Sequence, residues 1–231
     1  MKLNKKNKII FKIAADGSSA SGKTTGGKII AKKFNMNFLS SGLLYRYCAL
    51  KIIKNKNLCN ANFINKIAKT ITIKKLQNRN LHKPEVSKLS SIIAKKTFVR
   101  KALMNFQKNF IKKSDLVVVE GRDIGTKIMA KSADLKIFFT CSNREKAKRR
   151  QKELKSLNKK ITLKEVKKAL IQRDYDDKNR RISPLIMAKN AVLVDTTNLS
   201  LKQMEDKLVK LVKKSINIKY GSLQKSRHST K

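Results

Sequence analysis

The architecture of this chain can be predicted from one segment, Gly17-Ser18-Ser19-Ala20-Ser21-Gly22-Lys23-Thr24. This segment follows a mostly β-branched and apolar run, residues 8–15, and precedes a helical pattern that extends to about Phe34. The order of strand, loop and helix is the context in which the pattern G-x-x-x-x-G-K-[ST] forms a phosphate-binding loop, or P-loop. A Ser/Gly-rich turn that only caps a helix is the alternative, but such a cap requires neither the lysine nor the threonine.

Each residue type in the P-loop has a physical role in binding a nucleoside triphosphate. The glycines let successive backbone N–H groups face a phosphate, and the helix N-terminus adds partial positive charge. Lys23 would reach the β- and γ-phosphate oxygens, and the Thr24 hydroxyl would ligate Mg²⁺. The predicted ATP-binding residues are Gly17, Ser18, Ser19, Ala20, Ser21, Gly22, Lys23, Thr24 and Thr25.

Strand and helix patterns alternate along the rest of the chain, which predicts an α/β fold around a parallel sheet. Further strands are predicted at residues 38–39, 116–120, 135–140 and 191–195. Helices are predicted at residues 22–34, 41–54, 97–112, 143–157, 162–174 and 200–214, with Thr162 and Glu165 as a capping box. Residues 57–96 are irregular except for a β-like run at 70–73, and they suggest an inserted subdomain. Residues from about Asn217 onward are polar and basic and are predicted to be frayed.

Composition excludes several classes of protein. The 231 residues are 40% hydrophobic, enough for a packed core, and hold no apolar run of the roughly 20 residues that a membrane helix needs. We therefore expect a cytoplasmic protein with no membrane partner. The three cysteines have no C-x-x-C spacing and predict neither a disulfide framework nor a zinc site.

The net charge of +42 has two possible explanations. Clustered positive charge would indicate a surface for nucleic acid. Alternatively, the composition has drifted toward residues that A/T-rich codons specify, since the chain has 46 lysines beside many Ile and Asn. The lysines lie along the whole length, which favours drift, so we expect nucleic-acid binding to be incidental at most.

The 11 arginines are more informative than the lysines, which outnumber them about four to one. A planar guanidinium is required where a phosphate or carboxylate is held by two parallel hydrogen bonds. Arg46 and Arg122 follow predicted strands, and the carboxyl ends of strands are where open α/β sheets bind ligands. Five others, Arg149, Arg150, Arg173, Arg180 and Arg181, lie in two charged helices and the loop after them.

At these positions the chain resembles the bacterial cytidylate kinases. The blocks that carry the resemblance are, in order, the P-loop, Ser41-Gly-Leu-Leu-Tyr-Arg46, Pro84-Glu-Val-Ser with Ser90-Ser91, Val99-Arg100, Glu120-Gly-Arg-Asp-Ile-Gly-Thr126, Leu135-Lys-Ile-Phe-Phe, Lys146-Ala-Lys-Arg-Arg150, Gln172-Arg-Asp-Tyr-Asp-Asp-Lys-Asn-Arg180, Ser183-Pro-Leu185 and Val194-Asp-Thr-Thr197.

The resemblance implies a P-loop NTPase three-layer sandwich with a central parallel five-stranded sheet, built as one domain over residues 1–231. Its core would cover about 8–56, 97–142 and 183–216. A nucleoside-monophosphate-binding (NMP-binding) insertion would cover about 57–96, a helical lid about 143–182, and a frayed basic tail 217–231.

The resemblance also implies an enzyme that transfers the γ-phosphoryl group of ATP to CMP or dCMP, with Mg²⁺, by direct in-line transfer. Its catalytic residues would be Lys23, Arg149, Arg150 and Arg180, and its metal-binding residues Thr24 and Glu120. Its monophosphate site would consist of Ser41, Arg46, Ser91, Arg100, Arg122, Asp123, Arg173, Asp177 and Arg180. Within that site, Ser91, Arg100 and Asp123 would face cytosine, and Asp177 would face the ribose. A monomer is expected.

Three residues depart from the family pattern. Ser18 stands where the family often has Pro, Ser40 where it usually has Asp, and His82 where Arg is common, and the segment 57–80 is shorter than usual. The closest alternative is another P-loop kinase for a monophosphate or small metabolite. From a different class, a basic nucleic-acid-binding protein with a degenerate nucleotide site is the alternative, although the sequence has no helix-turn-helix, RNP or zinc-finger signature.

Overall fold

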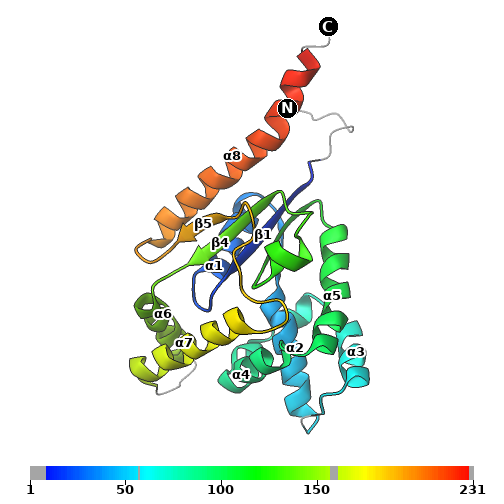
Figure 1. The fold of residues 1–231 in the computed structure, drawn as a ribbon, viewed down its shortest axis with the longest axis vertical. Coiled ribbons are helices and arrows are strands. Elements are labelled where there is room, and N and C mark those ends of the chain that lie inside the picture. Colours follow the sequence, from blue (N-terminus) through cyan, green and yellow to red (C-terminus); the bar gives the residue numbers. More distant parts are fainter. Residues whose placement is uncertain (1–8, 57, 157–160, 229–231) are drawn as a thin grey trace.

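A five-stranded, all-parallel sheet forms the centre of the molecule (Figure 1). The computed structural model describes residues 9–56, 58–156 and 161–228. The strands are β1 (Phe11–Gly17), β2 (Asn37–Ser40), β3 (Leu116–Gly121), β4 (Leu135–Thr140) and β5 (Val192–Asp195). Their order in the sheet is β2-β3-β1-β4-β5, so the strand that leads into the P-loop is central. The predicted parallel sheet is confirmed.

Helices cover both faces of the sheet and complete three layers. The helices are α1 (Lys23–Lys33), α2 (Ser41–Lys54), α3 (Ala61–Lys69), α4 (Pro84–Ile93), α5 (Thr97–Lys112), α6 (Asn143–Lys155), α7 (Leu163–Asn179) and α8 (Leu201–His228). Successive side chains of β3 point to opposite faces. Val117 and Val119 pack with the cluster that includes α2 and α5, while Val118 packs with the cluster of α1 and α8.

The segment between α2 and α5 contains α3 and α4 with two short 3₁₀ turns, η1 (Lys74–Gln77) and η2 (Arg79–His82). The predicted β-like run at 70–73 is wrong. Thr70 ends α3 and its hydroxyl donates to the Ile67 carbonyl at 2.8 Å, while Ile71 is buried in the α2–α5 cluster. A strand needs a neighbour to pair with, and the residues around this run are helical.

Helices α6 and α7 pack on each other through their own small cluster: Ala147, Leu154, Val166 and Leu170. The predicted capping box at Thr162 is confirmed, and α7 extends five residues beyond the predicted end to Asn179. The predicted end of the preceding helix at residue 157 lies outside the described residues.

The last helix is much longer than predicted. Its expected end near residue 214 is wrong, because α8 reaches His228. It thus extends into the predicted basic tail, whose residues 229–231 lie outside the described residues. Tyr220 explains the extension, because its hydroxyl donates to the Ile10 carbonyl at 2.6 Å and accepts the Ile10 N–H at 2.9 Å. The Lys219 ammonium donates to the same carbonyl at 2.6 Å. The helix therefore continues past the sheet and holds the chain that enters β1 (Figure 1).

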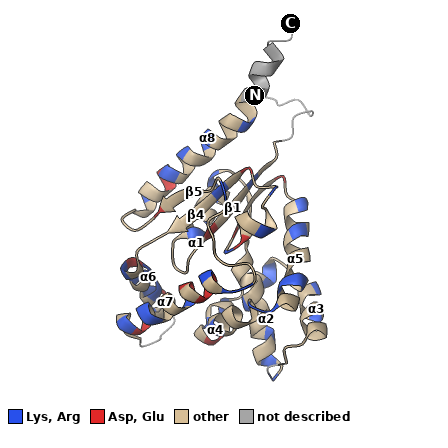
Figure 2. Ribbon diagram, in the orientation of Figure 1, with Lys and Arg blue, Asp and Glu red and all other residues tan. Residues whose placement is uncertain are grey.

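Lys and Arg residues occur on all the labelled helices rather than on a few of them (Figure 2). Within the described residues, no helix is both long and apolar enough to cross a membrane.

Candidate active site

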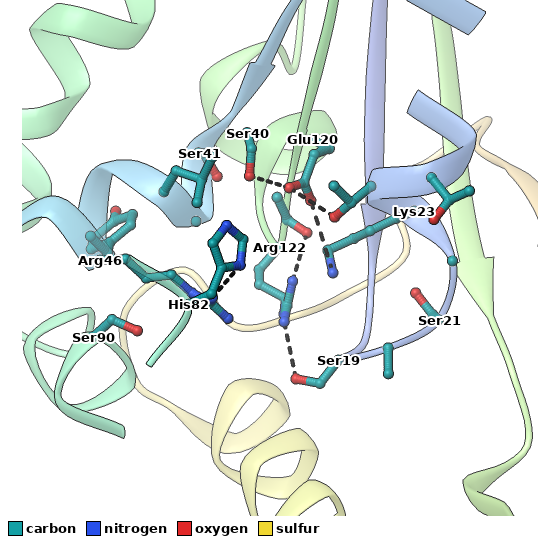
Figure 3. Close-up of a pocket in the computed structure, with 18 of the residues that line it drawn as sticks. Ser19, Ser21, Lys23, Ser40, Ser41, Arg46, His82, Ser90, Glu120 and Arg122 are labelled. Carbon is teal, nitrogen blue, oxygen red and sulfur yellow. Dashed lines mark hydrogen bonds and ion pairs between the residues drawn. The ribbon is translucent and has the colours of Figure 1, made fainter. Parts of the chain in front are cut away.

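A cavity of about 980 Å³ opens where the carboxyl ends of β1, β2 and β3 meet α1, α2, α4, α6 and α7. Figure 3 shows side chains from the P-loop, α1, β2, α2 and the end of β3 that face this cavity. The predicted site residues that line it are Ser19, Ala20, Ser21, Gly22, Lys23, Thr24, Thr25, Ser41, Arg46, Ser91, Arg100, Glu120, Arg122, Asp123, Arg149, Arg150, Arg173, Asp177 and Arg180. Residues that are far apart in sequence are thus brought to one place.

Gly17 and Ser18 are not among the described residues that line this cavity. Gly17 is paired with β4, where an added Cβ would collide with the Phe139 carbonyl oxygen. The Ser18 carbonyl accepts a hydrogen bond from the Lys23 ammonium at 3.1 Å. Gly22 precedes α1 with φ of 86°, a left-handed conformation that glycine adopts without a steric cost. These backbone requirements give the loop its curl before the helix.

Lys23 is buried beside Glu120, with 3.9 Å between the ammonium nitrogen and Oε2. Burial, and next the positive charge of Arg122, lower the pKa of Lys23 to about 7, while Glu120 acts in the opposite direction. Removing a cation from water disfavours its charged form unless an anion compensates. A bound phosphate would provide that anion.

Glu120 is buried at the end of β3 and is surrounded by oxygen and nitrogen donors. Its Oε1 accepts hydrogen bonds from the Ser40 hydroxyl and, at 3.2 Å, from the Thr24 hydroxyl. Ser40, which departs from the family pattern, thus fixes the carboxylate from β2. The described residues contain no group of three His, Cys, Asp or Glu side chains that could hold a metal by themselves.

Asp177 on α7 holds two arginines at the cavity. Its Oδ2 accepts from Arg122 Nε at 2.8 Å, and its Oδ1 pairs with Arg180 at 3.4 Å. These guanidinium groups hold the pKa of Asp177 below its usual range despite burial, which acts in the opposite direction. Arg122 also donates to the Ser19 hydroxyl at 3.1 Å, so one side chain connects α7, the end of β3 and the P-loop. Elsewhere in the cavity Arg100 forms a buried ion pair with Asp123.

Within the part of the chain that the structure describes, Arg46 and Arg173 form no ion pair with a carboxylate. Both donate to the Ser87 hydroxyl, at 3.3 and 3.0 Å, and Arg46 also donates to the Leu81 carbonyl at 3.3 Å. Among the described residues, Arg173 Nε is buried without a hydrogen-bond partner. Burial, followed by repulsion from neighbouring arginines, lowers the pKa of each to about 10. An anion at this place would satisfy both groups.

The two neighbouring arginines of α6 lie differently. Arg149 donates to the Thr196 hydroxyl at 2.8 Å and to the Thr196 carbonyl at 2.6 Å, close to Gly22. Arg150 pairs with Glu153 at 2.7 Å. Ser91 lines the cavity from α4, but its hydroxyl donates to the Lys88 carbonyl of its own helix.

Two buried carboxylates that were not predicted from the sequence hold the site together. Asp174 accepts the Ser19 N–H at 2.9 Å and the Lys146 ammonium at 2.6 Å, which ties the P-loop to α6 and α7. Asp16 accepts the N–H groups of Ile124 and Gly125, and burial raises its pKa to about 6. The sequence signals for these residues are weak. Asp16 is a carboxylate at the end of an otherwise apolar strand, and Asp174 lies beside Arg173, a predicted site residue.

Three comparisons with known proteins agree with this arrangement. A family model described as cytidylate kinase matches residues 13–214. A cytidylate kinase from Clostridium tetani is 36% identical over 225 residues, which cover 92% of this chain and 98% of that protein. A cytidylate kinase from Rickettsia akari is 35% identical over 207 residues, 89% of this chain and 93% of that protein.

Solved structures show the fold alone at their low identity. A gluconokinase from Sinorhizobium meliloti matches with a TM-score of 0.50 at 13% identity, over 94% of this chain and 99% of that one. A shikimate kinase from Bacteroides thetaiotaomicron matches with a TM-score of 0.50 at 14% identity, over 88% of this chain and 98% of that one.

Proposed function

The chain belongs to the cytidylate kinase family, and from this premise we propose that the cavity at the carboxyl ends of the strands is its active site. The reaction is transfer of the γ-phosphoryl group of ATP to CMP or dCMP, which gives ADP and CDP or dCDP. ATP would lie on the P-loop, residues 17–25, and the monophosphate on the side of Arg46 and Arg173. Residues 57–96 would form the NMP-binding insertion and 143–182 the lid of one domain. We further propose that the enzyme acts in the cytoplasm as a monomer.

The observation that carries this proposal is the charge imbalance of the cavity. Nine Lys and Arg side chains but only four Asp and Glu side chains line it among the described residues. MgATP and a nucleoside monophosphate together bring about four negative charges, which would balance this excess. The unpartnered Arg173 Nε and the lowered pKa of Lys23 both indicate that an anion completes the site.

Catalysis in this site would depend on alignment and positive charge rather than on a protein nucleophile. Charge in the transition state spreads over the equatorial oxygens of the transferring group, between two phosphates in line. Arg122 contacts both the P-loop, through Ser19, and the acceptor side, through Asp177. It is therefore suited to stabilise charge between donor and acceptor, together with Lys23.

The remaining arginines divide between the two substrates. Arg149 lies against the P-loop and would contact ATP, whereas Arg150 and Arg180 lie nearer the acceptor arginines. The Arg100–Asp123 pair would face the cytosine, where a fixed donor and acceptor side by side can read the edge of a base. Because α6 and α7 share their own cluster, they would move as one unit when the site closes.

The residues near Lys23 fit Mg²⁺, which prefers oxygen ligands and is often held by one carboxylate with substrate phosphates. Thr24 and Glu120 would hold the ion, and Ser40 would orient the carboxylate. When bound, Mg²⁺ would neutralise developing charge on the donor phosphates.

A coupled assay of ADP production with ATP and a panel of monophosphates tests the substrate. We expect the highest kcat/KM with CMP or dCMP, and equal or better turnover of AMP, GMP or dTMP would overturn the assignment.

Two variants test the residues. Lys23→Ala should abolish transfer, and Arg122→Gln should lower kcat about a thousandfold, as loss of a transition-state arginine does. Arg79→Gln is the matched control, because Arg79 is exposed and outside the cavity. An active Lys23→Ala enzyme would show that the P-loop does not bind ATP as proposed.

A further inference from the structure

His82 lines the cavity at the end of η2 and has no role in the site described so far. Its Nδ1 lies 3.4 Å from the nearest guanidinium nitrogen of Arg46. Figure 3 shows the ring projecting into the space that Arg46 and Arg122 also face. The side chain is half-buried, so a ligand in the cavity can reach it.

The contact with Arg46 defines the state of the ring without a ligand. A guanidinium can only donate hydrogen bonds, so Nδ1 must accept and the ring proton must be on Nε2. This contact favours the neutral form of His82 in the free protein, with the Nε2–H available as a donor.

The charged groups around the ring oppose its protonation. Burial and then Arg46 lower the pKa of His82; Arg150 and Lys28 act in the same direction, and Glu153 opposes them. These groups come from α1, α2 and α6, so the ring is enclosed by net positive charge.

A phosphate dianion beside Arg46 and Arg173 would offset the net positive charge of these groups. Arg46 would then turn from His82 toward the phosphate oxygens, and Nδ1 would be free to take a proton from solvent. The imidazolium can donate to the phosphate, and a charged donor makes the stronger hydrogen bond.

We propose that His82 is a further substrate-binding residue, which takes up a proton as the acceptor binds and holds its 5′-phosphate as an imidazolium. This inference rests on the proposed position of the monophosphate near Arg46. The affinity for the acceptor then depends on pH, because the charge of His82 depends on pH. An arginine at this position would be charged at every working pH.

The test is the KM for CMP between pH 6.5 and 8.5 in the wild type, His82→Gln and His82→Arg. We expect the wild-type KM to rise about three- to tenfold over this range, because each pH unit between the two pKa values of a linked group changes affinity up to tenfold. His82→Gln should have a high KM and His82→Arg a low one, and neither should show the additional rise with pH that His82 gives the wild type. The second ionisation of CMP is common to all three enzymes, so ratios between them remove it.

Lys83→Gln is the matched control. Lys83 is the residue after His82, and its exposed side chain lies outside the cavity, so this variant removes a nearby positive charge without changing the site. Its pH profile should follow the wild type, and KM for ATP should change little in every variant. Calorimetry of CMP binding in buffers of different ionisation enthalpy should detect proton uptake that His82→Gln lacks.

The outcomes separate this inference from the proposed function. A His82→Gln enzyme that phosphorylates CMP with the wild-type pH profile of KM would overturn the role of His82 and leave the reaction intact. A wild-type protein that does not phosphorylate CMP would overturn both.

Discussion

Replacing Lys23 with methionine should stabilise the ligand-free protein while it abolishes phosphoryl transfer. Lys23 is only 7% exposed, and its charged form is disfavoured by burial and by Arg122. Methionine is unbranched and fills a similar space without a charge. Glu120 loses its ammonium neighbour in this variant, but the hydroxyls of Ser40 and Thr24 still donate to it.

The magnitude follows from the pKa of Lys23 in the two states. Lys23 titrates near 10.5 when unfolded and at about 7 when folded, so the folded state binds fewer protons between these values. The unfavourable contribution of Lys23 is therefore fully present below pH 7 and is relieved as the pH rises toward 10.5. When the difference in bound protons is integrated over pH, Lys23 lowers the free energy of unfolding by about 4 kcal/mol at pH 7 and by about 2 kcal/mol at pH 9. For a chain of 231 residues, the pH 7 value corresponds to a Tm increase of roughly 10 °C.

Urea unfolding of the ligand-free proteins at pH 7 and pH 9 measures this difference. Lys32→Met on the same helix is the control, because Lys32 is exposed and its replacement should change the unfolding free energy by less than about 0.5 kcal/mol. The reasoning fails if Lys23→Met is less stable than the wild type at pH 7. It also fails if the gain in stability does not shrink by pH 9.

Further predictions concern packing and the buried ion pair behind the P-loop. Gly26→Ala should lower the unfolding free energy by about 1–3 kcal/mol, since its Cβ would lie 2.7 Å from the Phe139 ring. Gly221→Ala, whose Cβ meets nothing within 4 Å, should instead be neutral or stabilising; urea unfolding measures both variants. Asp174→Asn should cost about 3 kcal/mol and raise KM for ATP, and adding Lys146→Met should cost less than the sum of the two single effects in a double-mutant cycle.

Elements with a complete local signal could be predicted from the sequence. Helices α2 and α5 and strand β4 have the predicted bounds, because their apolar residues recur at one regular spacing. The P-loop was identified from residue type and context together. The convergence of Arg46 and Arg122 on one cavity also followed from sequence, since both lie after strands of a parallel sheet.

The features that the sequence could not predict depend on distant partners. Tyr220 extends α8 through hydrogen bonds to Ile10, 210 residues away, and nothing near Tyr220 indicates that contact. Asp174 likewise lies beside a predicted site arginine, but its partners Ser19 and Lys146 come from other elements. Hydrophobic periodicity describes one element at a time, so it identifies the surface that packs and not the polar pairs that connect elements.

Arginine and lysine are used differently at the cavity, and burial explains why. Seven of the 11 arginines but only two of the 46 lysines line it among the described residues. Burial lowers the pKa of Arg46 and Arg173 to about 10, so both stay charged at neutral pH, whereas the pKa of Lys23 is lowered to about 7. A lysine in place of either arginine would lose part of its charge before the phosphate arrived. The +42 charge thus combines many lysines outside the cavity with a few arginines whose charge persists on burial, and the arginines stay charged there before an anion binds.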